Sequence, residues 1–270
     1  MGMSILLNQS LLLIAPVIFL ALFVATAIGF GIGKRQIKCT SALEKLEKTA
    51  GTIAGAMLAL LGFILAICLS MADSHFEARR KLVLEEANAI GTARLRAIAI
   101  GGEQGTEIVR LLDDYVRLRK SFFSAGNDTD RLKLNYRQTS EIQNRIWENA
   151  SVIARNAPTP VSSILLSSLN ETFDLTNARR WAFEVNVPPY VVNLLLVFAL
   201  ISMGMMGYYF GVCGVRHPIL SALLNAAFTV AILLILDLNS PRTGFIQPEQ
   251  SPLNWLLEDM SQQIPGLRSK

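Results

Sequence analysis

The stretch TAGTIAGAMLALLGFILAICLSMA at residues 49–72 decides the fold class, because it contains no Asp, Glu, Lys, Arg or His. A helix needs roughly 20 predominantly apolar residues to cross the hydrocarbon core of a bilayer. Three other stretches have the same character: residues 11–33, 190–215 and 218–236. Backbone polar groups in lipid must be hydrogen-bonded within their own segment, so each stretch is predicted to be a transmembrane helix.

Charge is concentrated between the second and third of these stretches. Residues 73–188 hold 16 of the 25 Lys and Arg residues and 15 of the 21 Asp and Glu residues. The sequence therefore predicts an all-α membrane protein with four transmembrane helices and a soluble helical bundle inserted between helices 2 and 3. The expected parts are 1–72 (two spans), 73–188 (the bundle), 189–237 (two spans) and 238–270 (a tail with a short amphipathic helix).

The inserted region has the pattern of consecutive helices. The second span continues without a helix breaker to Gly101-Gly102, which predicts one helix of about 50 residues. Three amphipathic helices are expected after it, with apolar stripes over residues 108–122, 132–153 and 161–181 and with Gly or Pro between them. No alternating strand pattern competes with this interpretation.

Small residues recur at intervals of four within the spans. Gly51, Gly55 and Ala59 have this spacing, as do Gly207 and Gly211. Small side chains allow transmembrane helices to approach closely. Such contacts form either within one protomer or between protomers, and the sequence leaves both open.

Motifs for catalysis or metal binding are weak. The glycines before Lys34 (Gly29, Gly31 and Gly33) lack the spacing of a phosphate-binding loop and its following Ser or Thr. The cysteines Cys39, Cys68 and Cys213 have no paired spacing, and His75 and His217 are isolated. We therefore expect no enzyme activity, no cofactor, no metal and no nucleic-acid partner.

Two polar stripes mark the charged region. One comprises Glu85, Asn88, Thr92 and Arg96; the other Asn170, Asp174 and Asn177, with Arg179 and Arg180 just beyond. The first stripe could line a wet path or bind a partner helix, but a solvated helix face with intrahelical pairs explains it more simply. A structural pairing is a further possibility, in which Asp174 or Glu85 meets an arginine across the bundle, with Asn170 and Arg180 as additional pairing candidates.

A turn is expected where the last span leaves the membrane. Asp237 ends this span, and the residues from Asn239 to Gly244, including Pro241 and Arg242, are typical of a turn. The positive-inside rule does not decide the orientation, because six basic residues flank the spans on either side.

Several segments resemble the bestrophin-like family of bacterial four-span membrane proteins. The segments are LSMA at 69–72, FEARR at 76–80, EEANAIGTARLR at 85–96 and DLNSPRTG at 237–244, together with Leu169-Asn170-Glu171, Asp174 and Arg180. Asn239 and Arg94 depart from the family pattern, in which an acid and an aromatic residue are expected.

The resemblance implies a remote relationship to bestrophins, which are pentameric anion channels whose second helix lines an apolar neck. It therefore implies that Phe63, Ile67 and Met71 are pore-lining candidates. The residues alone favour a lipid-facing or packed apolar face instead. The resemblance also implies that the region between spans two and three and both termini are cytoplasmic.

Two functions follow as hypotheses. The first is a homo-oligomeric channel for small anions in the bacterial inner membrane, a pentamer by family analogy, with the second span lining the pore. The second is a membrane-anchored scaffold or sensor whose soluble helical domain binds a protein partner.

Overall fold

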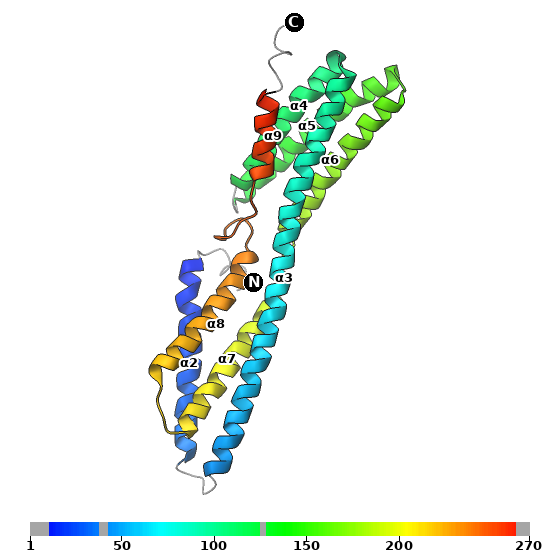
Figure 1. The fold of residues 1–270 in the computed structure, drawn as a ribbon. Helices are drawn as coiled ribbons and strands as arrows, with labels where there is room; N and C mark the ends of the chain where they lie inside the picture. Colours follow the sequence, from blue (N-terminus) through cyan, green and yellow to red (C-terminus); the bar gives the residue numbers. More distant parts are fainter. Residues whose placement is uncertain (1–10, 38–42, 125–127, 263–270) are drawn as a thin grey trace. The chain divides into compact units, whose positions relative to one another are not determined.

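The computed structural model describes residues 11–37, 43–124 and 128–262, and this part of the chain contains helices and no strand. The expected all-α class is therefore confirmed. The helices, drawn in Figure 1, are α2 (Leu11–Ile37), α3 (Leu43–Ile100), α4 (Gly102–Ser124), α5 (Thr129–Asn156), α6 (Pro160–Glu184), α7 (Pro189–Val212), α8 (Pro218–Leu238) and α9 (Ser251–Gln262).

The chain forms two compact units. Unit 1 comprises residues 1–75 and 186–246, and unit 2 comprises residues 76–185 and 247–270. Helix α3 contributes its first part to unit 1 and the remainder to unit 2. Among the described residues, four helical stretches are long and apolar enough to cross a membrane, and they include α2, the first part of α3, α7 and α8.

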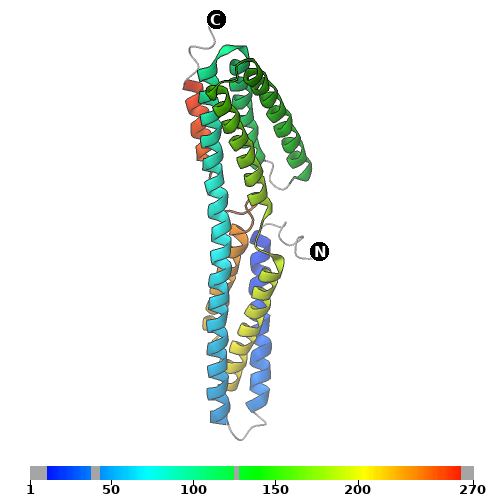
Figure 2. The ribbon, with the colours of Figure 1, turned by 90° about the vertical axis from the view of Figure 1, so that its right-hand side faces the viewer.

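In unit 1, α2 and α7 lie side by side, as Figures 1 and 2 both show. Glycines make this approach possible. A Cβ added to Gly207 would overlap the backbone carbonyl of Thr26, and one added to Gly211 would overlap that of Phe30. Gly29 of α2 is equally close to the carbonyl of Gly204. The spacing of Gly207 and Gly211 thus serves helix packing within one protomer.

The small residues of α3 have different surroundings. A Cβ on Gly51 would lie 3.0 Å from the ring of Tyr209, whereas a Cβ on Gly55 or Gly62 would meet no atom within 4 Å. This part of α3 therefore presents an open surface of small residues in the single chain.

Unit 2 has a continuous apolar core. The later part of α3 and helices α4, α5, α6 and α9 contribute to it, and α9 lies against α4. Its fully buried members include Ile90, Leu111, Leu112, Ile146, Leu165, Leu169 and Leu253. The amphipathic tail helix expected from the sequence is α9, which buries Leu253 and Met260 in this core.

Local chemistry explains where several helices begin and end. Gly101 and Gly102 have φ values of +66° and +69°, a left-handed conformation that glycine adopts without steric cost, and α3 ends just before them. The side chain of Asp128 accepts hydrogen bonds from the first backbone N–H groups of α5. Thr159 and Ser162 form a capping box at the start of α6.

Some helix limits differ from the expected ones. Helix α2 continues to Ile37 and α8 to Leu238, so both extend beyond their uncharged stretches. Helix α7 ends at Val212, three residues earlier than expected, and Gly214 follows with φ +67°. A helix ends where its hydrogen bonds end, and hydropathy alone does not report that position.

Candidate pore-lining face and buried ion pairs

The first candidate site is the outer face of α3 in unit 1. Phe63 is 64% exposed and Ile67 is 45% exposed, while Met71, one turn further along, is half-buried. The opposite face of the same helix, which carries Leu61, Leu65, Cys68 and Ala72, is buried within the unit. Helix α3 is therefore packed on one side, and its three predicted pore-lining residues lie on or beside the unpartnered side.

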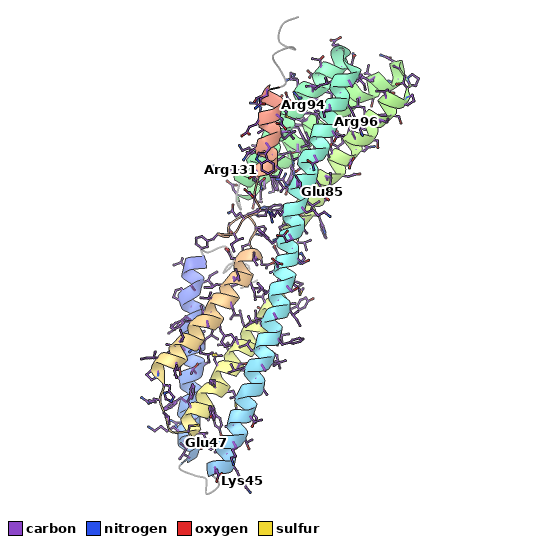
Figure 3. All side chains as sticks on the ribbon, in the orientation of Figure 1. Lys45, Glu47, Glu85, Arg94, Arg96 and Arg131 are labelled. Atoms are coloured by element: carbon purple, nitrogen blue, oxygen red, sulfur yellow. The ribbon has the colours of Figure 1, made fainter. Side chains whose placement is uncertain are left out.

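The polar stripe of α3 lies in unit 2. Lys81 and Glu85 form an ion pair at 3.6 Å on the same helix, and Asn88 and Thr92 are exposed. Arg96 donates a hydrogen bond of 3.1 Å to the carbonyl oxygen of Ile164 in α6. Figure 3 labels Glu85 and Arg96 on α3. The stripe is thus a surface feature that α6 contacts at Arg96.

The second stripe is on the surface of α6. Asn170 and Asp174 are exposed and line an open depression together with Ser167 and Glu171. Arg180 forms an ion pair at 3.2 Å with Glu184 of its own helix. The Arg180 guanidinium also lies 3.9 Å from the ring centroid of Tyr136, so this residue does contact α5.

The charged residues that pair across the helices are Glu86 and Arg179, which are next in sequence to the expected Glu85 and Arg180. Glu86, directly after Glu85, is fully buried between Arg119 of α4 and Arg179 of α6. The Nε of Arg119 is 2.6 Å from Glu86 Oε1, and Arg179 Nη1 binds Glu86 Oε2. A signal for this existed in the sequence, because Glu86 shares a helix face with the apolar residues Val83 and Ile90.

Hydroxyl groups complete the surroundings of Glu86. Thr176 Oγ1 is 3.1 Å from Glu86 Oε1, and the Tyr115 hydroxyl lies 2.5 Å from Thr176 Oγ1. Gln143 of α5 donates a hydrogen bond of 3.0 Å to the Tyr115 oxygen. Burial raises the pKa of Tyr115, so its hydroxyl stays protonated at neutral pH. Helices α4 and α6 therefore bind this carboxylate directly, and α5 is linked to it through the hydroxyls of Tyr115 and Thr176.

The electrostatic balance at Glu86 favours its charged form. Burial alone would raise the pKa of Glu86, because a carboxylate loses hydration in the interior. The charges of Arg119 and Arg179 and their hydrogen bonds outweigh burial, and the pKa of Glu86 lies below its ordinary value. The cluster thus consists of one carboxylate and two guanidinium groups, so its net charge is positive.

Two other buried arginines connect α3 to its neighbours in unit 2. Arg79 donates from Nε to the carbonyl of Ala182 at 2.9 Å and from Nη2 to that of Val185 at 2.6 Å. A cation there is favourable because the C-terminal carbonyls of α6 carry partial negative charge. Arg94 forms an ion pair at 2.8 Å with Asp113 of α4.

The residues after α8 form the expected turn in unit 1. The carboxylate of Asp237 accepts hydrogen bonds from the backbone N–H groups of Phe245 (2.7 Å) and Ile246 (2.9 Å). Gly244 is required because a Cβ would lie 2.7 Å from Asp237 Oδ1. Pro241 is buried in this turn, and Arg242 is half-buried.

Metal-binding groups are absent from the part of the chain that the structure describes: no three His, Cys, Asp or Glu side chains lie close enough together to hold an ion. Cys68 is buried and Cys213 is partly exposed, and both are free thiols. Cys39 falls outside the described residues.

The fold is similar to that of known crystal structures. A bestrophin homolog from Klebsiella pneumoniae, in a form solved by zinc phasing, is 16% identical with a TM-score of 0.61 and covers 92% of this chain and 100% of its own. A point variant of that homolog is 16% identical with a TM-score of 0.61, and the match covers 91% of this chain and 99% of the variant. A crystal structure described as a membrane protein is 16% identical with a TM-score of 0.64, and the match covers 92% of this chain and 100% of that protein.

Sequence comparison shows the family. No curated protein matches the sequence. The family of the Bestrophin-like domain matches residues 20–253, which include α3, α7, α8 and the larger part of α2, the buried ion cluster and the turn at Asp237. This protein therefore belongs to the Bestrophin-like domain family.

Proposed function

We propose that the protein is a homo-oligomeric channel for small anions, in which the outer face of α3 from each copy lines a shared pore. The observation that carries this proposal is the exposed apolar face at Phe63 and Ile67 on a helix whose other face is buried in its own unit. Family membership and the resemblance to bestrophins support the same assignment.

A pore of this kind needs no charged side chain. Residues 49–72 contain none, and rings of apolar side chains gate ion pores by dewetting. Transporters coupled to protons or ions usually carry an ionisable group within the membrane. The four apolar stretches of this chain contain no Asp, Glu, Lys, Arg or His. In this proposal Phe63 and Ile67, with Met71 one turn further, form the narrow apolar segment.

The proposal extends to location and topology. We infer a multi-pass protein of the bacterial inner membrane in which residues 73–188 form a cytoplasmic helical vestibule. The support is the concentration of charge in this region and the topology that the bestrophin resemblance implies. Its role is conduction, and no catalytic step is assigned.

Conductance of the purified full chain in planar bilayers tests this function. We expect an anion-selective current, and Phe63→Ala should raise the single-channel current, because a smaller side chain widens an apolar constriction. Leu20→Ala is the matched control, since Leu20 is an equally exposed apolar residue on α2 (61%). A silent wild-type protein, or equal currents for both variants, would contradict the pore assignment.

A second function has one specific observation in its favour. Helix α6 exposes Val161, Ile164 and Trp181, with 69% of Trp181 accessible, in the charged part of the chain. Exposed aromatic and aliphatic side chains are typical of protein-binding surfaces. A scaffold or sensor would retain a partner through this helix, and Trp181→Ala would release the partner without altering conductance.

A further inference from the structure

A cavity opens in unit 1 between α2, α7 and α8, away from the outer face of α3. Its volume is about 280 Å³, near the lower end for small-molecule pockets. The apolar part of its lining is formed by Phe23, Ala27 and Phe30 of α2 and Phe210 of α7. Arg216, His217, Pro218 and Ser221 line the end where α7 connects to α8.

The basic side chains at this end are held by aromatic rings of the cavity wall. The Arg216 guanidinium lies 4.9 Å from the ring centroid of Phe30. The His217 ring meets the Phe210 ring edge-on at 6.1 Å. A cation over an aromatic ring is attracted to its face, which keeps Arg216 at the cavity. The cavity thus has an apolar part and a polar part with a positive charge.

The start of α8 adds to this positive field. His217 is the N-cap of α8 and makes no side-chain capping hydrogen bond, and Pro218 is the first helical residue. The N-terminus of a helix carries partial positive charge, and its first N–H groups bind anions. Arg216, His217 and the α8 terminus therefore offer one anion site from adjacent residues.

The position along the helices matches the level of lipid headgroups. Lys34 and Arg35 occupy the last turn of α2, one turn beyond Phe30. Tyr208 and Tyr209 lie close to the end of α7 at Val212. Basic and aromatic residues of this kind gather where a transmembrane helix meets the headgroup region. The apolar part of the cavity consequently faces the acyl chains.

Nearby carboxylates are engaged elsewhere. At this end of unit 1, Glu44 pairs with Lys48 at 3.0 Å, and Glu47 accepts a hydrogen bond of 3.4 Å from the Cys213 thiol. None of the described residues that line the cavity is acidic. The charge of Arg216 is therefore available to a ligand.

We propose that this cavity binds one anionic phospholipid. The phosphate accepts hydrogen bonds from Arg216, His217 and the first N–H groups of α8, and part of an acyl chain occupies the space beside Ala27 and Phe30. A charge-assisted contact to Arg216 favours a lipid with net negative charge over a zwitterionic lipid, whose ammonium group finds no carboxylate in the cavity. This site is separate from the proposed pore and does not depend on conduction.

The test uses the full chain in nanodiscs that contain phosphatidylglycerol and phosphatidylcholine. Native mass spectrometry after release into detergent measures the lipid that remains bound. We expect the wild type to retain phosphatidylglycerol, and Arg216→Gln to lower this retention about tenfold, the effect of losing one charge-assisted hydrogen bond. Lys45→Gln is the matched control, because Lys45 is an exposed cation at the same end of unit 1 (Figure 3).

Two further arms keep the test decisive. Ala27→Phe fills the apolar part without touching the charge, and it should lower retention to the same extent as Arg216→Gln. Soluble glycerol phosphate distinguishes a lipid from a free anion. Equal retention by the wild type and Ala27→Phe, or complete displacement of the lipid by glycerol phosphate, would overturn the lipid assignment. Equal losses in Arg216→Gln and Lys45→Gln would show nonspecific attraction and would overturn it as well.

Discussion

At the scale of single residues, Glu86 stands out because one carboxylate organises three helices of unit 2. Its two arginine partners are 33 and 93 positions away in the chain, and all three side chains are at most 1% exposed. A buried ion pair contributes little net stability compared with a well-packed apolar group, but removing one partner leaves a buried charge uncompensated. The cluster therefore makes the fold of unit 2 sensitive to one carboxylate.

The substitution Glu86→Gln should lower the free energy of unfolding by about 3–5 kcal/mol, because two buried guanidinium groups lose their counter-charge. Glu85→Gln is the matched control: its partner Lys81 is 75% exposed, and such a surface pair contributes at most about 1 kcal/mol. Denaturant unfolding of the full chain in detergent, followed by circular dichroism, measures both. Equal effects of the two variants would contradict the role of the buried cluster.

The same residue sets a pH dependence. The pKa of Glu86 in the folded chain lies below its ordinary value of 4.5, so the folded state binds this proton more weakly than the unfolded state. The stabilisation is fully present above pH 4.5 and is lost as the pH falls through the lower folded pKa. The melting temperature of the wild type should therefore fall more steeply in acid than that of Glu86→Gln. Parallel pH profiles would argue against this linkage.

At the scale of elements, glycine has two different uses in the apolar helices. In α7, Gly207 and Gly211 permit backbone contact with α2 within the same chain. In α3, Gly55 and Gly62 face open space in the single chain, beside the exposed Phe63. The glycines of α3 therefore leave space in which lipid or another helix can pack. The glycines of α7 already contact the backbone of α2.

This difference predicts opposite effects of one substitution at two sites. Gly207→Ala should destabilise unit 1 by about 1–3 kcal/mol, because the added methyl group overlaps the Thr26 backbone. Gly62→Ala should be neutral or stabilising by up to about 1 kcal/mol, since alanine favours the helix and its methyl group meets no atom within 4 Å in the single chain. Thermal unfolding in the same detergent compares them. A stable Gly207→Ala protein would refute the close α2–α7 approach.

At the scale of the whole molecule, the proposed function requires several copies. A pore along one chain would need a lumen between only four apolar helices, and Phe63 and Ile67 are exposed on the outer face of α3. The small residues of α3 then become contacts between copies, in agreement with the role of small residues in helix association in lipid.

Oligomeric mass in detergent tests this requirement. We expect the wild type to be a homo-oligomer, by analogy a pentamer, and Gly55→Leu to shift the mass toward smaller species, because a bulky side chain separates neighbouring α3 helices. Gly31→Leu is the control, as Gly31 of α2 is equally open in the single chain. A monomeric wild type would refute both the assembly and the shared pore.

The sequence alone determined the features that depend on neighbouring residues. Four uncharged stretches specify apolar helices because lipid admits backbone only in hydrogen-bonded form. Gly101-Gly102 marks the end of α3, and the run from Asn239 to Gly244 forms a turn, because these signals act through local backbone conformation. The resemblance carried by EEANAIGTARLR is likewise a local pattern, and family membership is confirmed.

Tertiary structure decided which side chains meet. The apolar face of Val83 and Ile90 favours burial of Glu86 over Glu85, but it does not say which arginines Glu86 meets. Adjacent helix positions point about 100° apart, so pairing with Arg179 and not Arg180 depends on how α3 and α6 are rotated against each other. The same holds for the cavity at Arg216 and for the glycines of α7, whose partners lie on α2. Helix rotation results from packing of the whole unit, and no local stretch of sequence encodes it.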